Sequence, residues 1–348
     1  MKITSYQVFP VEAPFGKDRT WTHLVLRVQT DAGIEGISYV SRTRGAAIKA
    51  VVAMTQGVLE RLMADDVLAT EAIAAKLFGR HAFQSIDPKT ASLIDVALWD
   101  IRGKAAGQPL HRLLGGYRNR VPTYASWNIE PRAGHKGLAE DCAAHLARGF
   151  RSMKAHIGRG LSHQDALAHM RVMREAVGPD VDIMLDINQS WTAKEAIAMG
   201  RALLPYSPFW LEDLVPVEDY QAMRLVTETL ETPTCGGETY TTWASFQRLI
   251  EQRAFDIVMA DLDIGVTGFL KVAHMAELCG LPVVNHLATE VMAHCIAAVP
   301  NGLTVEYYPW AEWLFTEVPP VENGELVLSD RPGLGLEFDE AALKKYAL

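Results

Sequence analysis

The chain has 348 residues, of which 49% are hydrophobic and 22% are charged, and its 33 basic against 42 acidic residues give a formal net charge of −9. This composition is close to average soluble usage and argues against a disordered, collagen-like or coiled-coil chain. The acidic balance argues against nucleic acid as a partner, because binding phosphates requires clustered Lys and Arg. The length corresponds to roughly two domains.

The cysteines and the N-terminus bear on the cellular compartment. There is no CxxC pair, so neither a zinc site nor a disulfide framework is predicted, and the four cysteines indicate a reducing compartment: Cys142, Cys235, Cys279 and Cys295. Residues 1–14 alternate polar and apolar side chains, which is typical of a first strand and not of a signal peptide. No run approaches the ~18 apolar residues of a membrane span. We expect a cytoplasmic protein that does not bind membranes.

The first third of the chain mixes strand and helix patterns. Strand-like stretches at 2–9, 23–29 and 33–39 precede a helical pattern from Ala46, with a polar loop PFGKDRT between the first two stretches. Residues 90–115 have apolar residues at helical spacing and then Gly and Pro. We expect an α+β domain over residues 1–120.

From about residue 121 the pattern changes to eight short apolar runs separated by helical segments: PTYASW, FRSMKAH, VDIMLDIN, PFWLEDL, TPTCGGE, FDIVMAD, LPVVNHL and LTVEYY. Thr192 and Glu195 have capping-box spacing, and Gly280 follows a helical segment where a C′ residue belongs. Strands and helices alternating in this way predict a parallel sheet, either a barrel or a doubly wound sheet. We expect the catalytic domain over 121–320 and a segment, 321–348, that returns to the first domain.

The ends of these runs distinguish the two folds. Each of the later runs ends in charged or strongly polar residues: Lys154 and His156, Asp186 and Asn188, Glu212, Glu238, Asp261, His286, and Glu306. Ionisable groups at the end of a buried strand are costly unless they share a function. From Asp186 to His286 the successive groups are 23 to 26 residues apart, which one strand and one helix fill. This spacing favours a barrel whose strands deliver them to one catalytic face.

Three of these groups, Asp186, Glu212 and Glu238, are carboxylates from consecutive strands. Converging carboxylates repel one another, and a hard divalent cation with oxygen ligands removes the repulsion. Mg²⁺ fits better than zinc because neither Cys nor His joins the set. Three protein ligands leave positions for a substrate carboxylate and water. The alternative is that each carboxylate is a solvated loop residue or a helix cap.

Two further pairs suit proton transfer. Lys154 and His156 are two residues apart on a strand and therefore point to the same side, where Lys154 can offset charge on a substrate carboxylate and His156 can move a proton. Asp261 ends the strand before His286 and could orient its imidazole. A histidine with a structural role is the alternative for either ring.

Together with these residues, several longer motifs make the sequence resemble the mandelate racemase subgroup of the enolase superfamily. The similarity covers nearly the whole chain in order and rests on these motifs: DVALWDIRGKAAGQPLHRLLGG, FRSMKAHIG, MLDINQSW, WLED, GGE, VMADLDIGVTG, NHLATEVMAHCIAAVPN and SDRPGLGLEFDE. The resemblance implies an α+β capping domain on a modified (β/α)7β TIM barrel, with one Mg²⁺ on Asp186, Glu212 and Glu238. It also implies abstraction of the proton α to a carboxylate, giving an enediolate held by the metal, Lys154 and Glu306.

One position departs from the subgroup pattern. The second residue of the usual KxK pair is His156 here, which leaves open which residue is the first base. A racemase needs bases on both faces of the substrate, and His156 with His286 could supply them. Dehydration needs one base for the α-proton and one acid for the β-hydroxyl.

Substrate choice is expected in loops of the capping domain. The loop PFGKDRTW carries Lys17, Arg19 and Trp21, which suit a hydroxylated or doubly acidic substrate better than an aryl one; an exposed loop without a ligand is the alternative. Asn188 is a further candidate for substrate binding. Tyr307, Trp310 and Trp313 could form a wall of the pocket or belong to the core.

The resulting hypothesis is a Mg²⁺-dependent dehydratase that converts a sugar acid, an aldonate or aldarate, to a 2-keto-3-deoxy acid. A racemase or epimerase of a 2-hydroxy or amino acid is the second hypothesis. The third is a barrel that binds ligands or assembles without catalysis. The expected partner is a small carboxylate, and we expect a homo-oligomer.

Overall fold

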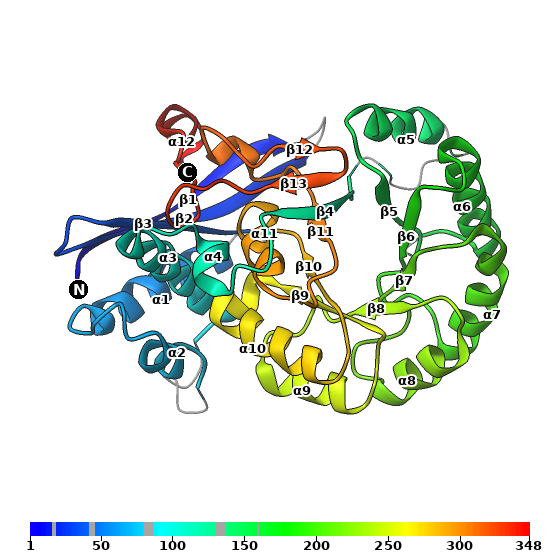
Figure 1. The fold of residues 1–348 in the computed structure, drawn as a ribbon, viewed down its shortest axis with the longest axis horizontal. Coiled ribbons are helices and arrows are strands. Elements are labelled where there is room, and N and C mark those ends of the chain that lie inside the picture. The colour runs from blue at the N-terminus through cyan, green and yellow to red at the C-terminus, as the bar shows by residue number, and fades with distance from the viewer. Residues whose placement is uncertain are drawn as a thin grey trace.

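The computed structural model describes residues 1–15, 19–41, 46–79, 86–127, 129, 135, 137–158 and 160–348. Figure 1 shows two parts side by side, a small N-terminal sheet with helices and a larger curled sheet that helices surround. None of the helices in these ranges combines the length and apolar character needed to cross a membrane.

The N-terminal part is an antiparallel sheet of β1 (Ile3–Phe15), β2 (Arg19–Thr30) and β3 (Glu35–Ser41). The predicted polar loop is wrong in extent, because Pro14 and Phe15 end β1 and Arg19 begins β2, with Phe15 paired to Arg19. The backbone hydrogen bonds of the hairpin therefore extend the two strands into this stretch despite its polar composition. The helices of this part are α1 (Ala46–Leu62), α2 (Thr70–Phe78), α3 (Pro88–Ala106) and α4 (Leu110–Leu114).

Helix α3 joins the two parts. Its N-terminus is capped by the Asp87 side chain, which accepts from the Lys89 amide, and it ends at Gly107 in the left-handed conformation. Residues on nearly every side of α3 are buried, because it packs against β3 on one side and against α10 on the other. This position brings Lys89, at its first turn, to the edge of the larger sheet.

The eight predicted strands of the larger part are confirmed: β4 (Arg120–Ala125), β5 (Ser152–His156), β6 (Asp182–Asp186), β7 (Trp210–Glu212), β8 (Thr234–Gly236), β9 (Ile257–Asp261), β10 (Val283–His286) and β11 (Val305–Tyr307). Parallel ladders run from β4 through β10, and β11 pairs with β4 on the other side. The helices between the strands are α5 (Leu138–Ala147), α6 (His163–Val177), α7 (Ala193–Leu203), α8 (Tyr220–Thr229), α9 (Trp243–Glu251), α10 (Gly265–Leu278) and α11 (Thr289–Ala298). Seven strand–helix units and a final strand make the expected (β/α)7β barrel.

Alternation along the strands separates two environments. A small apolar cluster fills the inside of the barrel: Tyr124, Met184, Trp210, Cys235, Ile257, Met259 and Val284. The intervening residues belong to the larger core between strands and helices. Because side chains alternate along a strand, the residues two positions after Met184, Trp210, Met259 and Val284 also point inward. These are Asp186, Glu212, Asp261 and His286.

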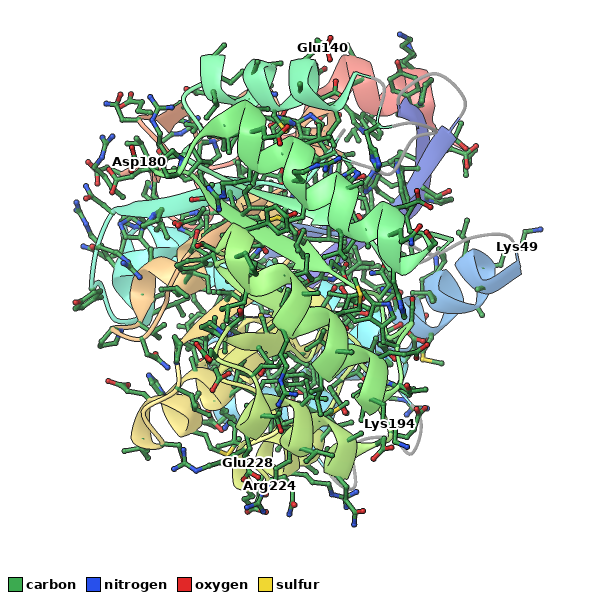
Figure 2. The ribbon with its side chains drawn as sticks, turned by 90° about the vertical axis from the view of Figure 1, so that its right-hand side faces the viewer. Lys49, Glu140, Asp180, Lys194, Arg224 and Glu228 are labelled. Carbon is green, nitrogen blue, oxygen red and sulfur yellow. The ribbon has the colours of Figure 1, made fainter. Side chains whose placement is uncertain are left out.

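The outer helices are amphipathic. In α9 the buried residues Phe246, Leu249 and Ile250 recur at helical spacing. Figure 2 shows charged side chains on the opposite, solvent-facing side, including Glu140, Lys194, Arg224 and Glu228. The predicted capping box of Thr192 and Glu195 is present at the start of α7. Gly280 follows α10 with φ of 72°, as its place after the helix predicts.

The C-terminal segment contacts both parts. It contains the hairpin of β12 (Val321–Glu322) and β13 (Glu325–Val327), and β13 pairs with β4 of the barrel. Helix α12 (Glu340–Tyr346) then packs near β1, where Ala347 forms an isolated bridge with Val11. In Figure 1 the C-terminus accordingly lies next to β1.

Candidate active site

The predicted polar residues meet at the carboxyl ends of the barrel strands. In the ladder between β5 and β6, His156 is opposite Asp186, and its Nδ1 lies 2.8 Å from Asp186 Oδ2. Burial alone would lower the pKa of His156, but the hydrogen bond and charge of Asp186 outweigh it, and the pKa lies above its ordinary value. Asp186 therefore favours the protonated ring, although the charge of Lys154 opposes it. The His156 side chain is still 33% exposed, so it faces the open end of the barrel.

Lys154 is enclosed below His156, with 1% of its side chain exposed. Its Nζ lies 2.6 Å from Glu212 Oε1 and 3.0 Å from Glu306 Oε1, so it joins β7 to β11 across the barrel. Burial alone would lower the pKa of Lys154, yet the two carboxylates raise it well above the usual value. A permanent positive charge is therefore held at the centre of the site.

His286 is held at both ring nitrogens. Its Nδ1 lies 2.6 Å from Asp261 Oδ2, as predicted from the neighbouring strands, and its Nε2 lies 2.8 Å from Glu238 Oε2. Burial opposes charging of this ring, but the charges of Glu238 and Asp261 prevail and raise its pKa well above the usual value. The backbone amide of Asp263 donates to Asp261 Oδ1 at 2.9 Å, which fixes the carboxylate that orients the ring.

The chemistry of the carboxylates suits a divalent cation. Burial raises the pKa of Glu212; Lys154 opposes this rise, and the negative charges of Asp186, Glu306 and Glu238 add to it. Within the described residues no three His, Cys, Asp or Glu side chains are already arranged as a metal-binding group. Each carboxylate instead pairs with a basic side chain: Asp186 with His156, Glu212 with Lys154, and Glu238 with His286. The carboxylates carry more negative charge than Lys154 alone can neutralise. A hard divalent cation prefers oxygen ligands of this kind.

Several residues of the site were not predicted. Asp213 is buried beside Glu212, and burial together with the charges of Glu238 and Asp186 raises its pKa well above normal. The buried side chain of Ser126 lies close to Glu306, and Trp210 Nε1 donates to Glu212 Oε2 at 3.0 Å. The adjacency of Asp213 to Glu212 in WLED was an available signal, whereas nothing near Ser126 in the sequence indicates that it lies beside Glu306.

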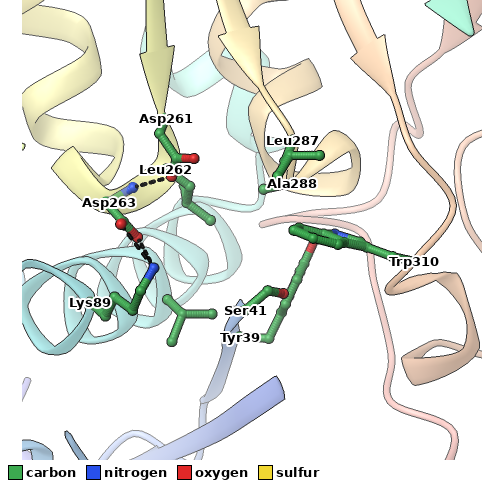
Figure 3. A pocket seen from close by; sticks show the side chains of 10 residues that line it. Tyr39, Ser41, Lys89, Asp261, Leu262, Asp263, Leu287, Ala288 and Trp310 are labelled. Atoms are coloured by element: carbon green, nitrogen blue, oxygen red, sulfur yellow. Dashed lines mark hydrogen bonds and ion pairs between the residues drawn. The ribbon is translucent and has the colours of Figure 1, made fainter. Parts of the chain in front are cut away.

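A pocket lies between the capping part and the barrel mouth (Figure 3). It is lined by Tyr39, Val40, Ser41, Lys89, Asp261, Leu262, Asp263, Leu287, Ala288 and Trp310. Lys89 Nζ donates to both carboxylate oxygens of Asp263 at 2.9 Å, which ties α3 to the short helix η3 (Leu262–Ile264) after β9. The pocket therefore reaches from the capping sheet to the carboxylate that holds His286.

The predicted substrate residues have different environments. Lys17 lies outside the described residues, and of Arg19 only the backbone, at the start of β2, is described. Trp21 packs edge-on against Trp310, with ring centroids 4.8 Å apart, so this pair connects the first hairpin to the pocket. Asn188 lies beside the carboxylates, where its Nδ2 donates to Asp186 Oδ2 at 2.5 Å.

The other two aromatic residues after β11 pack away from the pocket lining. The ring of Tyr307 packs against Trp127 and Phe150, and that of Trp313 against His23 and Tyr346. Of the three, Trp310 is therefore the one that lines the pocket.

Comparisons with known proteins agree with this architecture. Residues 2–115 match the family model of the mandelate racemase/muconate lactonizing enzyme N-terminal domain, and residues 137–342 match the enolase C-terminal domain-like model. The chain is 29% identical over 329 residues to L-talarate/galactarate dehydratase of Salmonella typhimurium, covering 92% of this chain and 81% of that protein. It is 31% identical over 272 residues to arabinonate dehydratase of Saccharolobus solfataricus, covering 73% and 70%.

A similar solved structure is that of L-talarate dehydratase from a Polaromonas species, complexed with Mg and L-glucarate. It has 28% sequence identity and a TM-score of 0.92, covering 100% of this chain and 97% of that chain. The two family models together span most of the chain, and the fold agrees over all of it. This chain therefore belongs to the mandelate racemase/muconate lactonizing enzyme family of the enolase superfamily.

Proposed function

We propose that this protein is a Mg²⁺-dependent dehydratase that converts a sugar acid to a 2-keto-3-deoxy acid. The observation that carries the proposal is the meeting of His156, Lys154 and His286 with buried carboxylates at one end of the barrel. The dehydratases among its relatives support the same chemistry.

Asp186, Glu212 and Glu238 would hold the cation. When bound, Mg²⁺ would offset negative charge on the substrate carboxylate. Replacing Glu238 with Gln keeps the side-chain size but removes one ligand charge, so we expect Mg²⁺ affinity to fall at least about tenfold. Calorimetric titration measures this, with Glu228→Gln on the outer surface as control. Equal affinities in the two variants would contradict the assignment.

His156 and His286 are the two groups that would move protons. We assign the first step to His156, which in its neutral form would take the proton from the carbon next to the carboxylate, leaving the electron pair on the substrate. Lys154 would stabilise the charge that develops on the carboxylate. In the second step the carbon–oxygen bond of the β-hydroxyl breaks, His286 gives its proton to the departing oxygen, and water leaves. The enol then becomes the 2-keto-3-deoxy acid.

The reaction is tested by incubating the pure protein with Mg²⁺ and a panel of aldonic and aldaric acids. A carbonyl reagent should reveal a keto acid from at least one member, and thorough chelation should abolish turnover until Mg²⁺ is restored. Product from no member, or turnover that persists after chelation, would overturn the proposal.

The two histidines are distinguished by isotope exchange in D₂O. We expect His286→Asn to abolish dehydration but retain some exchange of the α-proton, and His156→Asn to abolish both. Exchange that survives only in the His156 variant would reverse the assignment. Inversion of configuration without a keto product would instead favour a racemase, which also could use a base from each of two strands.

A further inference from the structure

The seam between β10 and β11 differs from the other strand contacts of the barrel. Along the described chain β10 forms a ladder with β9, whereas its contact with the segment before β11 is an isolated bridge between Val283 and Gly302. At this amino end, Leu303 N donates to the carbonyl of Val283 at 2.9 Å. Near the carboxyl end, where the candidate site lies, side chains take the place of the ladder.

The backbone of Glu306 shows this replacement. Its neighbours Val305 and Tyr307 direct their carbonyl groups to the β4 side, where they accept from Thr123 Oγ1 and Ser126 N. Because backbone groups alternate along a strand, those of Glu306 face β10. There the Glu306 amide donates to Asn285 Oδ1 at 2.9 Å, and the Glu306 carbonyl accepts from Thr289 Oγ1 at 2.8 Å.

Asn285 also fixes the turn that follows His286. Its Nδ2 donates to the carbonyl of Leu287 at 2.7 Å, and the amide of Leu287 donates to Glu306 Oε2 at 2.6 Å. Leu287 has φ of 52° and Ala288 has φ of 48°, a conformation that residues with side chains rarely adopt and that surrounding bonds must hold. The fully buried side-chain amide of Asn285 thus contacts the backbone of both Glu306 and Leu287. Through Leu287 it also acts on the carboxylate of Glu306.

We propose that Asn285 is a positioning residue that sets Glu306 against Lys154 and holds the turn after His286. It alternates with Val284 and His286, so its side chain lies on the helix-facing side of β10 and outside the interior of the barrel. Asn285 therefore acts on the site indirectly, through Glu306 and through the turn after His286. The proposal rests on the proposed function in that its kinetic test uses dehydration.

Asn285→Ala tests the proposal, with Asn301→Ala as a matched control. Asn301 makes the same kind of bridge at the opposite end of the barrel, where its Nδ2 donates to the carbonyls of Ala273 and Leu281 at 3.0 and 2.9 Å. We expect Asn285→Ala to lower kcat about 100-fold, since a displacement of about 1 Å has that effect, and to change KM much less. The control should keep kcat within about twofold at a similar loss of melting temperature. Equal kcat in the two variants would overturn the proposal.

Thr289→Val is the second variant should Asn285→Ala not fold. It is nearly isosteric and removes the bonds of Thr289 Oγ1 to the Glu306 carbonyl and the Tyr308 amide. It should also change kcat more than KM, and an unchanged kcat would count against the proposal.

If the wild-type protein turns over no acid, the proposed function fails, and crystal structures of the variants then test the positioning role of Asn285. The hydrogen bond from the Leu287 amide to Glu306 Oε2 should be lost in Asn285→Ala and retained in Asn301→Ala. A bond that is retained in both variants would overturn the proposal.

Discussion

The ammonium group of Lys154 lies between two buried carboxylates, Glu212 and Glu306, and balances part of their charge. Removing one partner from a buried ion pair costs more than the pair contributes, because the remaining charge stays in a poorly solvating interior. The site therefore depends on this cation for stability as well as for the proposed chemistry.

We predict that Lys154→Met lowers the free energy of unfolding by about 3–5 kcal/mol, measured by urea denaturation in the presence of a chelator. Lys271→Met is the control, since Lys271 pairs with Glu71 at the surface and its loss should cost less than about 1 kcal/mol. A similar small loss in both variants would show that Glu212 and Glu306 are stabilised by other means.

At this scale the sequence predicts groups that carry their own chemistry. Lys154, Asp261 and His286 stand out because charged residues at strand ends are unusual. Asn285 does not, because a neutral polar residue acquires its role from a partner, here Glu306, which is more than a dozen residues away in the sequence.

At the scale of elements, glycines with positive φ stand at both ends of α10, since Gly265 begins the helix and Gly280 lies two residues after Leu278, where it ends. Gly265 has φ of 69° with ψ of 172°, and Gly280 has φ of 72°, and residues with side chains rarely adopt either conformation. An added Cβ at Gly265 would lie 2.7 Å from Asp95 Oδ2 and 2.9 Å from the Phe78 ring, whereas at Gly280 it would meet nothing within 4 Å. Only Gly265 is required for close packing.

We predict that Gly280→Ala costs about 1–2 kcal/mol of unfolding free energy from the left-handed conformation alone. Gly265→Ala should cost roughly 1–3 kcal/mol more, because α10 must move away from Asp95 of α3 and because positive φ with an extended ψ is nearly restricted to glycine. Thermal or urea denaturation of both variants gives the difference, and equal losses would contradict the close contact.

The contact between β3 and α11 should give stability a dependence on pH. Burial raises the pKa of Glu290 to about 7, although the hydrogen bond from the Tyr39 hydroxyl, 2.5 Å from Oε2, opposes the rise. The folded protein therefore binds this proton more tightly than the unfolded chain, and stability falls as the pH rises from about 4.5 to about 7.

We predict that Glu290→Gln removes this fall, which amounts to roughly 3 kcal/mol between those pH values. Urea denaturation of wild type and variant at several pH values measures it as a difference that cancels the other titrating groups. Parallel curves for the two proteins would show that Glu290 keeps an ordinary pKa.

The order of elements follows from patterns that are local. Eight apolar runs separated by amphipathic helices predict the strands of the barrel, because buried parallel strands and helical spacing leave clear signatures. The length of the first hairpin was missed since its end depends on pairing between Phe15 and Arg19, and polar composition masks it. The seam at Asn285 was missed because its local sequence is that of any other buried strand.

At the scale of the whole molecule, the C-terminal segment joins capping part and barrel. Leu343 is buried, Arg27 pairs with Glu340, and the Leu348 amide donates to the Pro10 carbonyl at 3.2 Å. These contacts lie on β1 and β2, far from the ladders between β6 and β8. The stability of the capping sheet is therefore tied to this segment more closely than that of the barrel.

We predict that deleting residues 339–348 speeds amide exchange in β1 by tenfold or more, the equivalent of about 1.4 kcal/mol of local stability, and leaves β6 to β8 within about twofold. Hydrogen exchange followed by mass spectrometry resolves the two regions. Equal acceleration in both would show that the capping sheet and the barrel unfold as one unit.

The bridge between Val11 and Ala347 also sets an order of events during synthesis. At about 5–20 residues per second, the edge of β1 leaves the ribosome well before its partner is made, while the barrel strands between them can already pair. The edge of β1 consequently stays unfinished for tens of seconds while the barrel beside it is still being made. During that interval the cover over the barrel mouth is not locked, and the edge of β1 is open to other chains or to chaperones.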